Sequence, residues 1–331
     1  MKRILIIQTA SLGDVILTTP LIEKLHNFYP NTKLDFLLKY GYEGVLRRHP
    51  YIHHVIVWDK TQNKYKNLLE LIQIFREKKY DLIVNVQRFA SSGIITTFSG
   101  AKLTVGFSKN PFSIFFSKRV KHKINKFGDG PHETDRNLRL IEHLTDSSTF
   151  PMRLYPSDHD FAKVSQYKTK QYITVSPASL WFTKQFSKKQ WIEFVSSLHK
   201  DVMVYMLGSP KEKELCNQII DESNHNNSLN LAGRLTFLES SALMRDAAMN
   251  YVNDSAPMHM ASAMNAPVAA IFCSTVPEFG FGPKSENYHI IQTNQELACR
   301  PCGLHGFKTC PKKHFNCSLT IENEQLLNLA P

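Results

Sequence analysis

The chain has 331 residues, of which 42% are hydrophobic, and its formal net charge is +11. This length favours two domains, and no apolar run approaches the ~18 residues of a membrane-spanning helix. The first residues, Met1-Lys-Arg-Ile, begin an apolar strand rather than a signal peptide. We therefore expect a cytoplasmic protein without a spanning segment.

The positive charge is concentrated in the first half of the chain. Residues 1–150 carry 23 Lys or Arg and 13 Asp or Glu, whereas residues 151–331 carry 17 and 16. The first half therefore attracts an anionic partner, and nucleic acid, anionic lipid and a phosphorylated substrate all fit. Residues 115–123 mix aromatic and basic side chains and could lie at a membrane surface. For any single lysine, a solvated charged face is the alternative.

Short apolar runs alternate with helical patterns over the first 107 residues. Strands are expected at 3–8, 33–38, 54–58, 81–86 and 104–107, and helices at 14–28, 42–48, 63–79 and 91–97. Continuous apolar strands that alternate with helices predict a parallel sheet covered on both faces. A basic, aromatic segment follows, and then a helical run near 132–145.

The alternation restarts after a crossing that we place between 150 and 172. Strands are expected at 171–176, 201–207, 229–231, 251–253, 268–272 and 288–292, and helices at 188–199, 211–222 and 321–329. The sequence therefore predicts an α/β protein with two similar domains, 1–165 and 166–331, and a cleft between them.

The loop after the first strand, Thr9-Ala-Ser-Leu-Gly-Asp14, contains one glycine where a dinucleotide-binding turn needs three. No Walker sequence is present either, so a nicotinamide dehydrogenase and a P-loop enzyme are disfavoured. Asp14 stands near a helix start, where a carboxylate commonly caps free backbone N–H groups. The functional alternative is a base that accepts a proton from an attacking hydroxyl.

Two polar stretches follow strands of the second half. After 171–176, Lys184 could neutralise a diphosphate and Ser179 and Thr183 could donate hydrogen bonds to it; solvent exposure is the alternative for Lys184. After 251–253, Asp254 suits sugar hydroxyls, and Ser255 begins a helix whose N-terminus suits an anion. His259 could reach phosphates or be a core histidine.

Four cysteines cluster near the end of the chain. Cys299 and Cys302 form a Cys-x-x-Cys pair, and Cys310 and Cys317 follow it. A structural zinc site is one interpretation, although the second pair is spaced too widely for the usual pattern. A local disulfide and buried free thiols are the alternatives, and the absence of a secretion signal favours reduced thiols.

Taken together and in order, these motifs resemble those of the family-nine glycosyltransferases, the ADP-heptose:lipopolysaccharide heptosyltransferases. The resemblance covers nearly the whole chain, and its markers are Ser11-Leu-Gly-Asp14, Asn85-Val-Gln-Arg88, Thr183-Lys184, Gly233-Arg-Leu-Thr236, and Asn253-Asp-Ser255 with His259. The run Glu278-Phe-Gly-Phe-Gly-Pro283 and the Cys-x-x-Cys tail look most like the heptosyltransferase II branch.

The resemblance implies a GT-B glycosyltransferase fold, with two Rossmann-like domains facing a cleft. The first domain would bind the growing inner core of lipopolysaccharide and the second the nucleotide-sugar donor, ADP-heptose. Transfer would be inverting and independent of a divalent metal, and no further cofactor is implied. The anionic acceptor implies a peripheral protein at the inner face of the cytoplasmic membrane, and no nucleic-acid partner.

The resemblance also assigns roles to residues. Asp14 would be the general base and Lys184 would stabilise the departing diphosphate. Donor-side residues would be Ser179, Thr183, Lys184, Gly233, Leu235, Thr236, Asp254, Ser255 and His259. Acceptor-side residues would be Gly13, Arg88, His132 and Arg136.

The chain departs from the family pattern in two places. The usual Asp-Ser/Thr-Gly is here Asp254-Ser255-Ala256, which lacks a glycine that permits close approach of the backbone to phosphate. The tail after Cys317 is short, so we expect an abbreviated last helix. Other readings are another nucleotide-sugar enzyme of the same fold, such as an epimerase, a hydrolase or a transferase of a different sugar, and a non-enzymatic binder of anionic lipid or nucleic acid.

Overall fold

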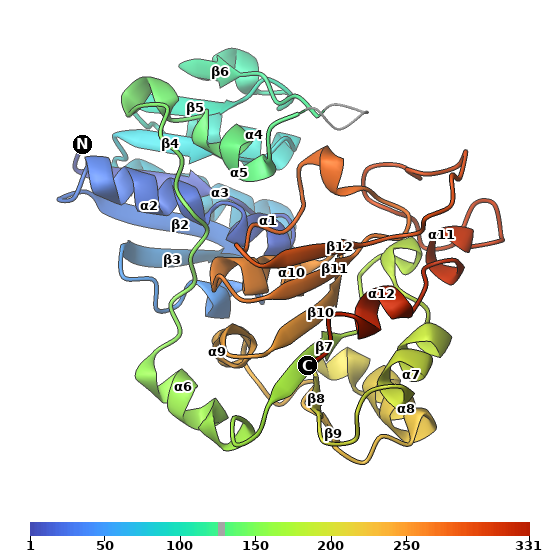
Figure 1. Cartoon of the computed structure of the whole chain (residues 1–331). Helices are drawn as coiled ribbons and strands as arrows, with labels where there is room; N and C mark the ends of the chain where they lie inside the picture. The colour runs from blue at the N-terminus through green and yellow to red at the C-terminus, as the bar shows by residue number, and fades with distance from the viewer. Residues whose placement is uncertain (125–129) are drawn as a thin grey trace. The chain divides into compact units, whose positions relative to one another are not determined.

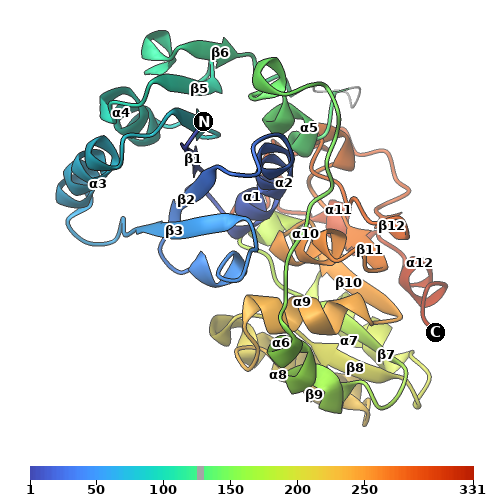
Figure 2. The same ribbon diagram turned by 90° about the vertical axis from the view of Figure 1, so that its left-hand side faces the viewer.

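The computed structural model describes residues 1–124 and 130–331, which form two compact units. The first unit comprises residues 1–124 and 130–155, and the second begins at Pro156. Residues 156–165, which the sequence-based boundary assigns to the first domain, belong to the second unit. They contain helix α6 (Asp158–Val164), which packs against α9 (Phe237–Arg245), as both views show (Figures 1 and 2).

The first unit contains a six-stranded, fully parallel sheet of order β3-β2-β1-β4-β5-β6. Its strands are β1 (Arg3–Ile7), β2 (Lys33–Lys39), β3 (Ile52–Trp58), β4 (Leu82–Asn85), β5 (Leu103–Phe107) and β6 (Lys118–Val120). Its helices are α1 (Leu12–Ile16), α2 (Thr19–Phe28), α3 (Lys64–Lys78), α4 (Ala90–Phe98) and α5 (Glu133–Leu138). Helix α3 packs beside α4, and α2 packs beside α5 (Figure 2).

The hydrophobic core of the first unit explains this arrangement. Strand β1 is buried from Ile4 to Ile7, as a central parallel strand requires. Helix α3 buries Leu68, Leu71, Ile72 and Phe75 against the sheet, a spacing that places one apolar stripe on one helical face.

The expected helix at 14–28 is two helices, because the chain turns at Leu17 and Thr18. The hydroxyl of Thr18 donates to the carbonyl of Asp14 at 2.7 Å, and that of Thr19 donates to the carbonyl of Ile16 at 2.8 Å. Pro20, which has no backbone N–H, then stands at the start of α2. The expected helix at 42–48 is only a 3₁₀ turn at Glu43–Val45.

The second unit repeats the architecture, with a parallel sheet of order β12-β11-β10-β7-β8-β9. Its strands are β7 (Tyr172–Ser176), β8 (Met203–Met206), β9 (Ser228–Asn230), β10 (Met249–Asn253), β11 (Val268–Ile271) and β12 (Tyr288–Ile291). Besides α6 and α9, its helices are α7 (Lys188–Ser196), α8 (Lys213–Ser223), α10 (Ala256–Ala263), α11 (Asn316–Leu319) and α12 (Glu324–Leu327). Helix α12 is short, as expected.

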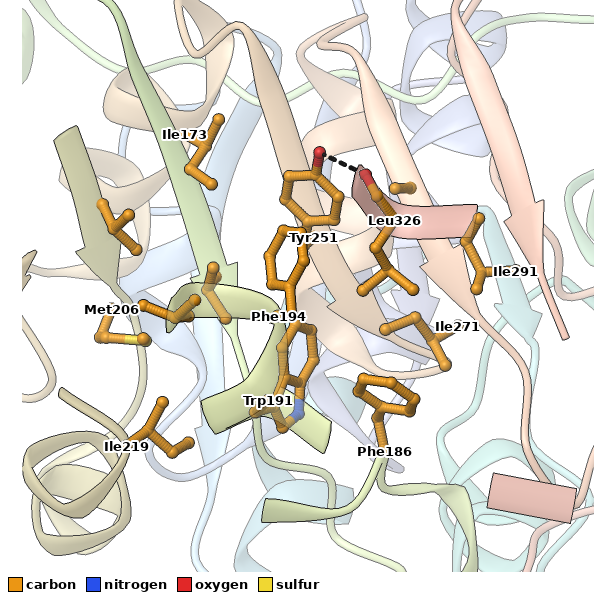
Figure 3. Close-up of a cluster of buried hydrophobic side chains, with 14 of the residues drawn as sticks. Ile173, Phe186, Trp191, Phe194, Met206, Ile219, Tyr251, Ile271, Ile291 and Leu326 are labelled. Atoms are coloured by element: carbon orange, nitrogen blue, oxygen red, sulfur yellow. Dashed lines mark hydrogen bonds between the residues drawn. The ribbon is translucent and has the colours of Figure 1, made fainter. Parts of the chain in front are cut away.

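The core of the second unit joins this short tail to the sheet (Figure 3). Trp191 and Phe194 of α7 are fully buried, and Phe194 lies against Tyr251 of β10. The Tyr251 hydroxyl donates to the carbonyl of Leu326 in α12 at 3.1 Å. Burying each of these aromatic side chains contributes about 2–3 kcal/mol.

The expected α/β class with two Rossmann-like units is thus confirmed. In the part of the chain that the structure describes, every helix is too short or too polar to traverse a lipid bilayer.

Candidate active site

Each sheet has one switch point, where the chain leaves two neighbouring strands in opposite directions. In the first sheet it lies between β1 and β4, whose last residues, Ile7 and Asn85, are paired in register. In the second it lies between β7 and β10, where Ser176 pairs with Val252. Open α/β sheets bind ligands outside the carboxyl ends of the strands at this point. Each unit therefore has one candidate site, described separately below.

Asp14 follows β1 at the first switch point and closes a capping box with Ser11. Asp14 Oδ2 accepts hydrogen bonds from the Ser11 hydroxyl at 2.6 Å and from the Ser11 N–H at 3.1 Å, and the Asp14 N–H donates back to the hydroxyl at 3.2 Å. The capping interpretation is therefore confirmed. Within residues 1–124 and 130–331, Oδ1 accepts no hydrogen bond, so the half-buried carboxylate keeps one oxygen for another partner.

Arg88 follows β4 at the same switch point and is exposed, with its guanidinium 5.6 Å from the centre of the Phe89 ring. The preceding loop is fixed by Asn85, whose side chain donates to Thr96 at 2.8 Å and accepts from the Gln87 N–H at 2.8 Å. Gly13 is buried within α1. The structure thus places Gly13, Asp14 and Arg88 in the two loops that flank one switch point.

His132 directly precedes α5, and Arg136 lies within it. The His132 Nδ1 accepts the N–H of Thr134 at 3.2 Å and caps the helix. Arg136 is 1% exposed and donates to Glu133 at 2.8 Å, and Glu133 also binds His122 at 2.9 Å. Burial would raise the pKa of Glu133, but His122 and Arg136 outweigh it and the pKa is lowered. Arg136 therefore lies in a buried ion-pair network, and its acceptor-side role rests on the resemblance alone.

A lysine that the sequence reasoning missed contacts the loop that precedes Asp14. Lys60 follows β3, and its ammonium donates to the Thr9 carbonyl at 3.0 Å and to the Thr9 hydroxyl at 2.8 Å. It also lies 4.4 Å from the centre of the Trp58 ring. Burial, with the nearby charges of Lys39 and Lys64, lowers the pKa of Lys60 to about 8. Its position directly after an expected strand was the available signal, because all parallel strands end at one edge.

Tyr42 also belongs to this neighbourhood. Burial raises the pKa of the Tyr42 phenol, and the Asp14 carboxylate raises it further. A cavity of about 310 Å³ elsewhere in the unit is lined by Lys24 of α2, by residues in and beside α5, and by Glu142 and residues 146–149, and includes none of the predicted acceptor-side residues. We therefore place the candidate site at the switch point and not at this cavity.

In the second unit, Lys184 and Asp254 meet at the switch point between β7 and β10. The Lys184 Nζ lies 2.6 Å from Asp254 Oδ2, and the two side chains are 15% and 6% exposed. The Thr275 hydroxyl, which follows β11, donates to the same carboxylate oxygen at 2.6 Å. Solvent exposure, the alternative for Lys184, is therefore wrong.

The loop that carries Lys184 is held by its neighbours. The Asn253 side chain, at the end of β10, accepts the Phe186 N–H at 2.8 Å and donates to the Pro177 carbonyl at 2.8 Å. Ser179 lies within this loop, where its carbonyl accepts from the Gln185 side chain at 2.7 Å. The end of β10 thus determines the course of residues 177–186.

Thr183 is 1% exposed, and its hydroxyl oxygen already accepts hydrogen bonds from the Ser274 hydroxyl at 3.0 Å and the Phe307 N–H at 2.8 Å. It therefore anchors the loop and is less suited than Lys184 to binding phosphate. Leu235 is half-buried, and Thr236 caps α9 through a capping box with Glu239. Gly233 has φ +75°, and a Cβ there would lie 2.9 Å from the Cα of Pro210, so this turn requires glycine.

Helix α10 begins after Asp254, at Ala256, with Pro257 in its first turn. The Ser255 hydroxyl donates to the Asn253 carbonyl at 3.2 Å and leaves the helix N-terminus without a side-chain cap. Its backbone N–H groups can therefore bind an anion. His259 is 5% exposed and lies in the interior part of α10.

The cysteine-rich tail contacts this site through its backbone. The half-buried guanidinium of Arg300 donates to the carbonyls of Cys273 at 2.7 Å and Thr275 at 3.0 Å. A Cβ at Gly306 would lie 3.1 Å from both Lys184 Cγ and Thr183 Oγ1. The tail therefore fixes the segments that present Lys184 and Thr275, a role that the sequence reasoning did not assign.

All six cysteines are free, so the local-disulfide interpretation is wrong. Cys299 lies 3.8 Å from His314. Over residues 1–124 and 130–331, no three Cys, His, Asp or Glu side chains are arranged to hold a metal ion. The arrangement of Cys299, Cys302, Cys310 and Cys317 therefore gives the zinc interpretation no support.

Comparison with known proteins finds relatives of this chain. Lipopolysaccharide heptosyltransferase 3 of Escherichia coli is 27% identical over 80% of this chain and 81% of its own length. Lipopolysaccharide core heptosyltransferase OpsX of Haemophilus influenzae is 22% identical over 91% of this chain and 87% of its own. The solved structure of E. coli ADP-heptose lps heptosyltransferase II has a TM-score of 0.80, with 20% identity over 99% of this chain and 97% of that one, and shares the fold.

The model of glycosyltransferase family 9 (heptosyltransferase) matches residues 68–306, more than half of the chain. That match includes Arg88, Lys184, Asp254 and Gly306. The chain therefore belongs to glycosyltransferase family 9, the heptosyltransferases.

Proposed function

We propose that this protein transfers heptose from ADP-heptose to the inner core of a lipopolysaccharide precursor, with inversion at the anomeric carbon. The observation that carries the proposal is the Lys184–Asp254 ion pair, 2.6 Å long, at the switch point of the second sheet. A cation and a carboxylate side by side suit the diphosphate and the sugar hydroxyls of one nucleotide-sugar. The relatives named above for lipopolysaccharide and ADP-heptose support this choice of substrates.

In the proposed reaction, an acceptor hydroxyl attacks the anomeric carbon of the heptose. The new glycosidic C–O bond forms as the bond from that carbon to the diphosphate oxygen breaks, and ADP leaves with the electron pair. Asp14 accepts the proton of the attacking hydroxyl through Oδ1, since its Oδ2 is held by Ser11. Lys184 and the N–H groups at the start of α10 stabilise the negative charge that develops on the leaving diphosphate. These groups supply the positive field, so the proposal includes no divalent metal.

The acceptor side of the proposal rests on charge. The first half of the chain carries the excess of Lys and Arg, which fits a lipid-linked acceptor with carboxylate and phosphate groups. Lys60 and Arg88, in loops at the carboxyl ends of β3 and β4, are the basic residues best placed to bind it. We propose accordingly that the protein works in the cytoplasm as a peripheral protein at the inner face of the membrane, and that nucleic acid is not a partner.

The test is an assay of ADP release with purified protein, ADP-heptose and a heptose-deficient lipopolysaccharide core acceptor. We expect ADP and a glycosylated acceptor to form in equal amounts, with release lost when the acceptor is omitted. Equal release without acceptor would identify a hydrolase, and conversion of the donor sugar without transfer would identify an epimerase. A panel of other nucleotide-sugars tests the donor, and chelation with EDTA should leave the rate unchanged.

A further inference from the structure

A short turn of the first unit exposes two large apolar side chains next to each other. Ile114 is 67% exposed and Phe115 is 62% exposed, in the 3₁₀ turn Ser113–Phe115 between β5 and β6. We call residues 109–123, which include this turn, the basic–apolar segment. Adjacent apolar side chains exposed to this extent on an ordered turn form a candidate contact surface, to be weighed with the charges beside them.

The turn is exposed although the chain on both sides of it is firmly held. On one side Asn110, which is 1% exposed, donates to the carbonyls of Gln87 and Phe89 at 3.0 Å each. On the other side Phe116 is buried against Gly106, where an added Cβ would lie 2.6 Å from the Phe116 ring. The exposed tip is therefore presented by a fixed backbone, and Asn110 joins it to the loop that carries Arg88.

The Lys and Arg residues of the segment are not balanced by any acidic residue within it. The segment contains no Asp or Glu, and its five basic residues are all exposed: Lys109, Lys118, Arg119, Lys121 and Lys123. None of the five forms an ion pair with a carboxylate in the described parts of the chain. An exposed apolar tip in a segment whose exposed charges are all basic is complementary to an anionic bilayer, where the apolar groups enter the headgroup region and the cations face lipid phosphates.

Another exposed apolar pair lacks this charge pattern. Tyr65 and Leu69 on α3 are 77% and 65% exposed, similar to the tip. However, their helix carries charges of both signs, including Lys66 and Glu70, which form an ion pair at 3.9 Å. Tyr65 and Leu69 are therefore the matched control, because they are exposed apolar side chains in an element that carries charges of both signs.

We propose that the basic–apolar segment docks the protein onto an anionic phospholipid bilayer through Ile114 and Phe115. The inference rests on the proposed function, in which the acceptor is anchored in a membrane. Docking at this segment also holds the Arg88 loop close to the lipid surface, because Asn110 connects the two.

Vesicle co-sedimentation tests the proposal with the full-length protein. Vesicles of phosphatidylcholine with phosphatidylglycerol should bind the protein, and phosphatidylcholine alone should bind it much less. The double variant Ile114→Ser/Phe115→Ser, and separately Lys118→Gln/Arg119→Gln, should each weaken binding by at least ~10-fold, since one basic residue near such a surface contributes about fivefold. Tyr65→Ser/Leu69→Ser should bind like the wild type, and all variants should keep the wild-type unfolding temperature, because the changed side chains are exposed.

Wild-type binding by the tip variant, or an equal loss in the α3 control, would overturn the docking proposal. Binding of duplex DNA or of RNA that depends on the same lysines, without vesicle binding, would also overturn it. Transfer to a detergent-dispersed acceptor separates the two proposals. If the wild-type protein is inactive in that assay, the proposed function is contradicted. If the wild-type protein is fully active and the Ile114→Ser/Phe115→Ser variant still binds vesicles normally, only the docking proposal is contradicted.

Discussion

The ion pair between Lys184 and Asp254 permits a quantitative test. At 2.6 Å and an effective dielectric constant of about 20, the gross Coulomb attraction is about 6 kcal/mol. Desolvation of two largely buried groups offsets much of this attraction, but removing one partner leaves the other charge buried without its counter-ion. We therefore expect Lys184→Met and Asp254→Asn each to lower the free energy of unfolding by ~3 kcal/mol.

The double variant should lose less than the sum of the single losses, with a coupling energy of ~2 kcal/mol, because both charges are then absent. A surface pair provides the control. Lys188 and Glu222 also lie 2.6 Å apart, but their side chains are 40% and 51% exposed. Removing either should cost less than about 1 kcal/mol. Urea unfolding of the four single variants and two double variants gives both cycles.

Measuring kcat of Lys184 variants separates the stabilising role of Lys184 from its proposed catalytic role. If its ammonium stabilises the leaving diphosphate, Lys184→Met should lower kcat by ~10²–10³, and Lys184→Arg should recover part of the loss. Steady-state ADP release at saturating acceptor measures this. Additive stability losses would refute the coupling, and a folded Lys184→Met protein with wild-type kcat would refute the assignment of Lys184 to the leaving group.

Three further predictions concern single residues. Asp14→Asn should lower kcat by ~10²–10⁴ yet retain donor affinity in calorimetry, since an asparagine side-chain oxygen can still accept the Ser11 hydrogen bonds; undiminished turnover would eliminate Asp14 as the base. The pKa of Lys60 is lowered to about 8, below its ordinary value, so the folded state binds this proton less tightly and stability should rise with pH between about 8 and 10. Lys60→Met should flatten that rise in urea unfolding and raise the acceptor KM at pH 7; an unchanged pH profile contradicts the reasoning. Gly306→Ala should lower kcat more than Gly100→Ala, because both have φ above +70° but only at Gly306 would the added Cβ lie 3.1 Å from Lys184 Cγ; equal effects would mean that backbone strain alone matters.

Much of the fold could be predicted from the sequence because central parallel strands are continuous apolar runs. β1 and β4 are mainly of this kind, whereas β7 and β10 are buried but also contain polar residues, Thr174 in β7 and Asn250 in β10; polar residues follow all four strands. The loops at both switch points were therefore recognisable. β6 was missed because Lys118-Arg-Val is an exposed edge strand, whose sequence is indistinguishable from a basic loop.

Contacts between residues far apart in the sequence could not be predicted from the order of apolar and polar residues. The spacing of Lys184 and Asp254 along the chain does not reveal that their side chains meet, since this follows from the pairing of β7 with β10. Lys60 was overlooked because a lysine in a polar loop is usually solvated, and its partial burial depends on Trp58 and the Thr9 loop. The burial of Arg136 beside Glu133 was also not predictable from the sequence, which had suggested a contact between Arg136 and the acceptor.

The capping box at α1 reconciles the two interpretations of Asp14. A carboxylate that contacts only solvent loses side-chain entropy when it is positioned for proton transfer. The Asp14 carboxylate has already lost this entropy on folding, because Ser11 holds its Oδ2. The cap therefore orients Oδ1 without occupying it. This leads to a distinct expectation for Ser11→Ala, which keeps the carboxylate but removes its hydroxyl partner. Turnover should fall ~10-fold, less than in Asp14→Asn, with little change in acceptor KM. A Ser11→Ala protein with full turnover would show that the cap serves the helix alone.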